Sequence, residues 1–65
     1  MKNAPTTDRG RATLERIVTT ACELFYRQGV HATGINDVVD ASGTGKGQLY
    51  HYFDDKPDLI LTVIT

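Results

Sequence analysis

Two short segments with helical spacing, residues 35–41 and 46–52, are separated by the four residues 42–45, of which two are glycines. Apolar side chains recur three or four positions apart in this region, so they lie on one face of each helix. Glycine at position 43 can adopt a positive φ, which lets the chain reverse its direction there. The three parts are therefore predicted to form two helices joined by a tight turn, the helix-turn-helix arrangement.

A longer helix is predicted before this unit and a fourth helix after it. Apolar residues between positions 8 and 28 recur at the spacing of one helix face, and Gly29 is predicted to end that helix. Asp55 is expected to cap the fourth helix, with Asp58 in its first turn. Residues 59–64 are apolar on nearly every side, so we expect this helix to be covered by further chain or by a second copy. The predicted core consists of Leu14, Ile17, Val18, Ala21, Leu24, Phe25, Ile35, Val38, Val39, Leu49 and Phe53.

Length and charge limit what a chain of 65 residues can be. It forms one small domain that buries only about 60% of the surface of its unfolded chain. No apolar run approaches the roughly 20 residues of a membrane-spanning helix, and the charged N-terminus lacks a secretory signal, so we expect a cytoplasmic protein with no membrane partner. Seven Lys and Arg against eight Asp and Glu give a net charge of -1. This charge keeps open a helical protein–protein interaction module without a DNA role.

The glycines around Lys46 invite comparison with the phosphate loop of nucleotide hydrolases, but the pattern departs from it. That loop reads G-x-x-x-x-G-K-[ST] and follows a buried strand. Position 40 is Asp rather than Gly, Gly47 stands where a hydroxyl would bind magnesium, and the preceding segment has helical spacing. No catalytic residues, cofactor or metal site are predicted, because His31 and His51 lack a framing carboxylate pattern and no catalytic triad or carboxylate pair is placed. We therefore expect no enzyme.

An ordered set of residues carries a family resemblance. Its members are Ala21, Leu24, Phe25, Gly29, Thr33, Ile35, Val38, Ala41, Gly43, Lys46, Gly47, Leu49, Tyr50, Tyr52, Phe53, Lys56 and Leu59. With its spacing and its ending LYHYF-x-x-K, the set resembles the N-terminal DNA-binding domain of TetR/AcrR-type transcriptional regulators, over roughly residues 9–65.

The resemblance implies an all-α fold, a three-helix homeodomain-like bundle with a helix-turn-helix over residues 8–55. A flexible arm, residues 1–7, is expected before it. Residues 56–65 are expected to be the start of a fourth, linking helix to a C-terminal effector and dimerisation domain that this chain lacks. The implied function is sequence-specific binding of a double-stranded DNA operator by a regulator whose usual mode is repression. The implied partners are a second copy in the full-length homodimer and a small-molecule effector, bound only through the C-terminal domain.

Residues at the helix starts are candidates for DNA contact. Lys46 opens the third helix, where it can meet a phosphate or a guanine edge, and Gln48 is exposed by helical phase, so its amide can read adenine. Gly47 would let the backbone approach a base. Thr33 and Gly34 open the second helix with N–H groups that suit a phosphate.

The resemblance adds three consecutive residues of the third helix, Tyr50, His51 and Tyr52, as contacts mainly to phosphates, and Lys56 as a backbone contact. Arg9 and Arg11 are open to two interpretations, contacts to flanking DNA or charges of a disordered arm. The complete predicted site is Thr33, Gly34, Lys46, Gly47, Gln48, Tyr50, His51, Tyr52 and Lys56.

Overall fold

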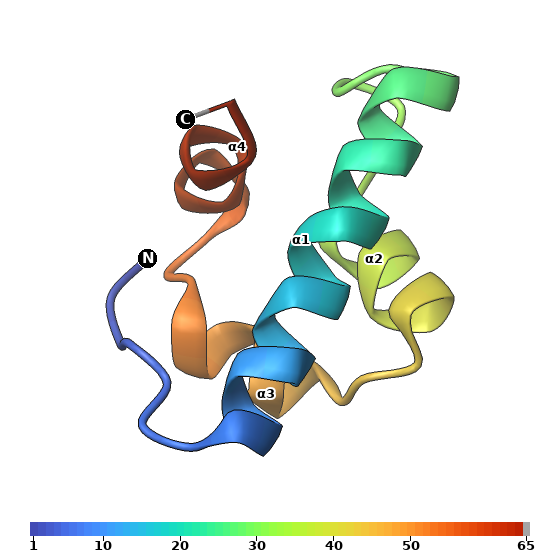
Figure 1. Cartoon of the computed structure of the whole chain (residues 1–65). Helices are drawn as coiled ribbons and strands as arrows, with labels where there is room; N and C mark the ends of the chain where they lie inside the picture. Colours follow the sequence, from blue (N-terminus) through green and yellow to red (C-terminus); the bar gives the residue numbers. More distant parts are fainter. Residues whose placement is uncertain (65) are drawn as a thin grey trace.

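The computed structural model describes residues 1–64, which fold into four helices (Figure 1). They are α1 (Asp8–Gln28), α2 (Ile35–Ser42), α3 (Lys46–Tyr52) and α4 (Lys56–Ile64). The three shorter helices pack against α1, which crosses the molecule from one end to the other. The all-α prediction and the helix positions are confirmed, with α2 one residue longer than expected. Thr65, the last residue of the expected linking segment, lies outside the described residues.

Caps and glycines define where the first two helices begin and end. Thr7 is the N-cap of α1, and its hydroxyl oxygen accepts a hydrogen bond from the Gly10 N–H at 3.0 Å. Gly29 ends α1 with φ of 91°, and its N–H donates to the Phe25 carbonyl. Gly43 ends α2 in the left-handed region with φ of 73°. Residues with a side chain rarely adopt these φ values, so both predicted glycine stops are confirmed.

The core lies where α1 meets the other three helices. Its fully or almost fully buried members are Ile17, Ala21, Val38, Leu49, Tyr52, Phe53 and Leu59. All eleven predicted core residues belong to this cluster or pack against it, and Tyr52, Leu59 and Val63 join them. Leu49 and Phe53 are 0% exposed, and burying each side chain contributes about 1.5–3 kcal/mol. These two residues attach α3 to the bundle from one side only.

The expected cap of α4 is confirmed. The Asp55 carboxylate accepts a hydrogen bond from the Asp58 N–H at 3.0 Å, and the Asp58 carboxylate accepts one from the Asp54 N–H at 3.0 Å. Pro57 lies in the first turn of the helix, where a missing N–H leaves no bond unmade. Within residues 1–64, no helix is both long and apolar enough to cross a bilayer.

The N-terminal arm, residues 1–7, lies against the end of α3 (Figure 1), and its flexibility stays a prediction. The Lys2 N–H donates to the Tyr52 carbonyl at 2.8 Å, and the Asn3 amide donates to the His51 carbonyl at 2.5 Å. The last carbonyls of a helix have no partner within the helix, so they are available acceptors. The Lys2 N–H and the Asn3 amide supply donors for two of these carbonyls.

Candidate nucleic-acid interface

Helix α3 has a buried face and an exposed face. Leu49, Tyr52 and Phe53, spaced by three and four positions, point into the bundle. The other face is exposed and consists of Lys46, Gly47, Gln48, Tyr50 and His51. Within residues 1–64, Lys46, Gly47 and Gln48 are all exposed, so this edge of α3 is open. Five of the predicted site residues are therefore brought together on one open surface.

The Gln48 side chain folds back onto the start of α3 and accepts a hydrogen bond there. Its side-chain oxygen accepts a hydrogen bond from the Gly45 N–H at 3.3 Å, which satisfies one of the N–H groups at the helix start. Bidentate pairing with adenine uses that same oxygen together with the amide NH₂ group. Gln48 can therefore read a base after exchanging this long internal bond for a bond to the base edge.

The lysines of the predicted site are not paired within the described residues. Lys46 is exposed and Lys56 is partly buried at the first residue of α4, and neither ammonium group forms an ion pair within residues 1–64. The nearby Asp54 carboxylate lies 3.1 Å from the Lys2 ammonium group, which offsets its negative charge. Local charge beside α3 is thus more favourable to a phosphate than the net charge of -1 suggests.

The two predicted site residues at the start of α2, Thr33 and Gly34, form hydrogen bonds within the protein. Thr33 is 1% exposed, its hydroxyl donates to the Gly29 carbonyl at 2.8 Å, and its N–H donates to the Val30 carbonyl at 3.3 Å. The Gly34 N–H donates to the Asp37 carboxylate at 2.9 Å. Both N–H groups have partners within the protein, and a contact of Thr33 or Gly34 with DNA stays a prediction.

Tyr52 lies in the core and not on the exposed face, and its contact with DNA stays a prediction. It is 7% exposed, and its hydroxyl donates to the Gly10 carbonyl of α1 at 3.4 Å. The His51 ring packs edge-on against it, with ring centroids 4.9 Å apart. The signal was present in the sequence, since position 52 stands three residues after Leu49 and one before Phe53, on the inner face.

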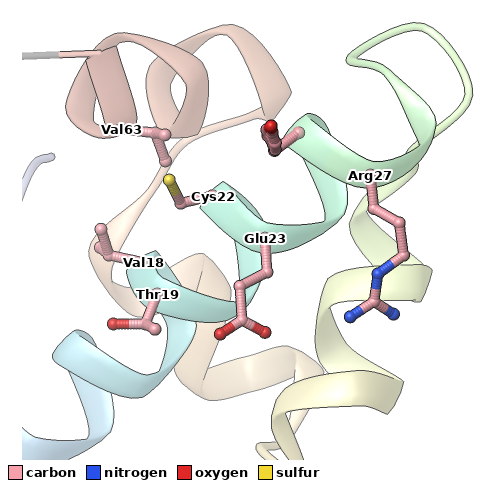
Figure 2. Close-up of a pocket in the computed structure, with 7 residues that line it drawn as sticks. Val18, Thr19, Cys22, Glu23, Arg27 and Val63 are labelled. Atoms are coloured by element: carbon pink, nitrogen blue, oxygen red, sulfur yellow. The ribbon is translucent and has the colours of Figure 1, made fainter.

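A second surface lies far from the exposed face of α3. A hollow of about 730 Å³ opens between α1 and α4, with Val18 and Cys22 facing Val63 and with Glu23 and Arg27 at its rim (Figure 2). Its walls are largely apolar, and the neighbouring Tyr26 and Ile64 are 85% and 71% exposed. None of the predicted site residues line it. Among residues 1–64, no group of three His, Cys, Asp or Glu is placed to hold a metal ion.

Comparisons with known proteins agree with this geometry. Residues 17–63 match the family described as "Bacterial regulatory proteins, tetR family". The chain is 48% identical over 54 residues, 83% of its length, to the protein of Lactococcus lactis subsp. lactis named "Uncharacterized HTH-type transcriptional regulator in lacX 3'region". It is 39% identical over 78% of its length to the HTH-type transcriptional repressor KstR2 of Rhodococcus jostii (strain RHA1). It is 35% identical over 75% of its length to the HTH-type transcriptional activator FasR of Mycolicibacterium smegmatis (strain ATCC 700084 / mc(2)155).

The matched part covers 28%, 24% and 22% of these three proteins, so the chain spans about a quarter of the length of such relatives. No solved structure matches the chain with statistical significance. The matched region includes α2, α3 and their turn completely, which is the part that carries the exposed face described above.

Proposed function

This chain belongs to the tetR family of bacterial regulatory proteins, and we propose that it binds an operator in double-stranded DNA by placing α3 in the major groove. One observation carries the proposal. The Lys46–Gln48 edge of α3 is open, while Leu49 and Phe53 fix the opposite side of the helix in the core. A recognition helix needs this combination, because its base-reading side must be free and its position must be fixed.

The proposal gives each exposed residue a role. Lys46 and Lys56 contact backbone phosphates, and so do the Tyr50 hydroxyl and the His51 imidazole. Gln48 reads a base edge through its amide, and such a bidentate pair contributes about 1–3 kcal/mol of discrimination against the wrong base.

Gly47 supports the same interpretation. A Cβ atom added there would meet no atom within 4 Å, so nothing in the fold requires glycine at this position. Glycine in a helix costs about 0.5–1 kcal/mol relative to alanine. The proposed role explains why glycine is nevertheless present, because it lets the α3 backbone approach a base closely.

For the longer protein we propose a homodimer in which two such domains read half-sites about 34–36 Å apart. Residues 56–65 would start the helix that links residues 8–55 to a domain for dimerisation and for a small-molecule effector. The similar proteins include one named a repressor and one named an activator. We propose repression, because a protein bound at an operator blocks access to the same DNA. No catalytic role is proposed.

A titration with a fluorescently labelled duplex of arbitrary sequence at low salt tests DNA binding. Such binding depends mainly on phosphate contacts, so the operator need not be known. We expect Lys46→Gln to weaken binding and to reduce the slope of log K against log salt by about 1. Arg27→Gln is the matched control, since it removes the same charge from the far end of α1 and should leave the slope unchanged.

The amide signals of the same titration separate DNA binding from its rival. Perturbations at residues 44–52 support α3 as the DNA-contacting element. Perturbations confined to residues 57–64 would favour a helical interaction module without a DNA role. Equal salt slopes for the wild-type chain and Lys46→Gln would remove Lys46 from the interface.

A further inference from the structure

A second hollow lies between α3 and the first two turns of α1. It has a volume of about 340 Å³ and is lined from α1 by Arg9, Gly10 and Thr13, and from α3 by Gln48, His51 and Tyr52. Gln48 and His51 also belong to the exposed face of α3. The hollow is therefore continuous with the proposed DNA-contacting face and extends it onto α1.

The hollow has the charge and the polar groups that an anion needs. No Asp or Glu lines it, and the Arg9 guanidinium forms no ion pair within residues 1–64. Arg11, only two residues further on, differs in both respects. It does not line the hollow, and its guanidinium lies 4.0 Å from the Asp8 carboxylate. Arg9 is therefore the arginine of this turn that is available to an anion in the hollow, and Arg11 is not.

Gly10 and Tyr52 set the distance between the two walls. The Tyr52 hydroxyl lies 3.4 Å from the Gly10 carbonyl, which joins the first turn of α1 to the last turn of α3. A Cβ atom at Gly10 would lie 3.1 Å from the Tyr52 hydroxyl and 3.2 Å from the Thr7 hydroxyl. A side chain at position 10 would therefore need the Tyr52 and Thr7 side chains to move by a few tenths of an ångström, which would alter the contact between the two walls.

We propose that this hollow is a seat for a phosphate of the DNA backbone, contacted by the Arg9 guanidinium from α1 and by the His51 imidazole N–H from α3. Gly10 and Tyr52 act as positioning residues that hold the two walls at the required distance. The inference rests on the proposed function and deepens it, because it adds α1 to an interface otherwise made by α3 and the start of α4. An arginine reaches a phosphate with paired N–H donors, which gives geometric specificity as well as charge.

The test compares Arg9→Gln with Arg11→Gln in the titration with a duplex of arbitrary sequence. Both variants remove one positive charge from an exposed position of the same turn, so neither should impair folding. We expect Arg9→Gln to weaken binding roughly fivefold at low salt and to reduce the salt slope by about 0.9, as for one lost phosphate contact. Arg11→Gln should leave both quantities near the wild-type values. Equal effects of the two variants would overturn the proposal.

Gly10→Ala tests the positioning role with a readout that charge does not explain. It removes no charged group, so it should weaken duplex binding only by moving the two walls, and it should shift the amide signals of both walls before DNA is added. Unchanged affinity in a folded Gly10→Ala chain would remove Gly10 and Tyr52 from the proposal.

Two further outcomes separate the possible failures. If the wild-type chain binds no duplex at low salt, the proposed function and this inference fail together. If the wild-type chain binds and Arg9→Gln binds equally well, only the inference fails. Inorganic phosphate should give no saturable shift at Arg9 and His51, and a saturable shift there would indicate a site for a free anion instead of the DNA backbone.

Discussion

At the scale of single residues, Gly47 and Gly10 differ in what surrounds them. Gly10 faces three atoms within 3.3 Å of an added Cβ, so packing against Tyr52 and the arm favours glycine there. Gly47 faces open space and has no positive φ, so neither packing nor backbone geometry requires it. Because the fold does not require glycine at position 47, a substitution there can test whether DNA binding requires it.

We therefore expect Gly47→Ala to separate stability from binding. It should raise the free energy of unfolding by about 0.5–1 kcal/mol, because alanine loses less backbone freedom than glycine in a helix. It should weaken duplex binding, because the methyl group keeps the α3 backbone away from the bases. Denaturant unfolding and fluorescence anisotropy measure the two effects. A stabilised variant that binds DNA as tightly as the wild-type chain would show that close backbone approach is not needed.

Residue-level predictions from the sequence succeeded where helical phase decides exposure. The phase placed Leu49 and Phe53 inside and Gln48 outside, as observed. Helical phase also places Tyr52 on the inner face, whereas the family resemblance groups it with Tyr50 and His51 on the DNA side. Thr33 could not be placed from the sequence, since its burial depends on hydrogen bonds to the carbonyls of Leu24 and Gly29 across a loop.

At the scale of elements, the sequence predicts the helices but not the contacts that the N-terminal arm makes with α3. Periodic apolar residues predicted α1 to α4, and glycine stops predicted the ends of α1 and α2 to within one residue, since both are local signals. The arm donates hydrogen bonds to main-chain carbonyls of α3. Every sequence has such carbonyls, so no residue pattern predicts the contact. The arm's other anchor is the Met1 ammonium group, which lies 2.6 Å from the Asp58 carboxylate of α4.

This anchor makes the arm sensitive to acid. The hydrogen bond from the Met1 ammonium group, followed by the one from the Asp54 N–H, lowers the pKa of Asp58 below its ordinary value of 3.8. A carboxyl whose pKa is lower in the folded than in the unfolded chain stabilises the fold above the unfolded value, and this contribution is lost as the pH falls through the folded value. We expect the amide signals of Lys2 and Asn3 to show release of the arm at the acid end of a pH titration.

Asp58→Asn is the matched variant for the acid titration, since it keeps the shape of the side chain and removes its charge. In this variant the arm should be less firmly held at neutral pH, and its signals should lose the acid transition assigned to Asp58. If the Lys2 signal moves with pH in the same way in both chains, Asp58 does not hold the arm.

At the scale of the whole molecule, the two hollows lie on different sides of α1 and differ in character. The hollow beside α3 is the more polar of the two and is continuous with the edge that carries Lys46, whereas the hollow between α1 and α4 is largely apolar. The exposed Tyr26 and Ile64 extend the apolar surface. The sequence predicted that α4 needs further cover from its nearly uniform apolar character, but it could not indicate that α1 contributes the facing wall, because that depends on how the helices cross.

The apolar surface gives a prediction that compares two lengths of the protein. Ile64→Gln should change the free energy of unfolding of the 65-residue chain by no more than about 0.5 kcal/mol, since the side chain is 71% exposed. In a longer protein that carries the proposed C-terminal domain, the same change should lower it by about 1.5–3 kcal/mol, because the side chain is then buried. Leu59→Ala is the control, and it should cost about 2–5 kcal/mol in both, because Leu59 is 0% exposed already. Denaturant unfolding of both lengths measures these values. An Ile64→Gln effect that is equally small in both would mean that the surface between α1 and α4 stays open in the longer protein.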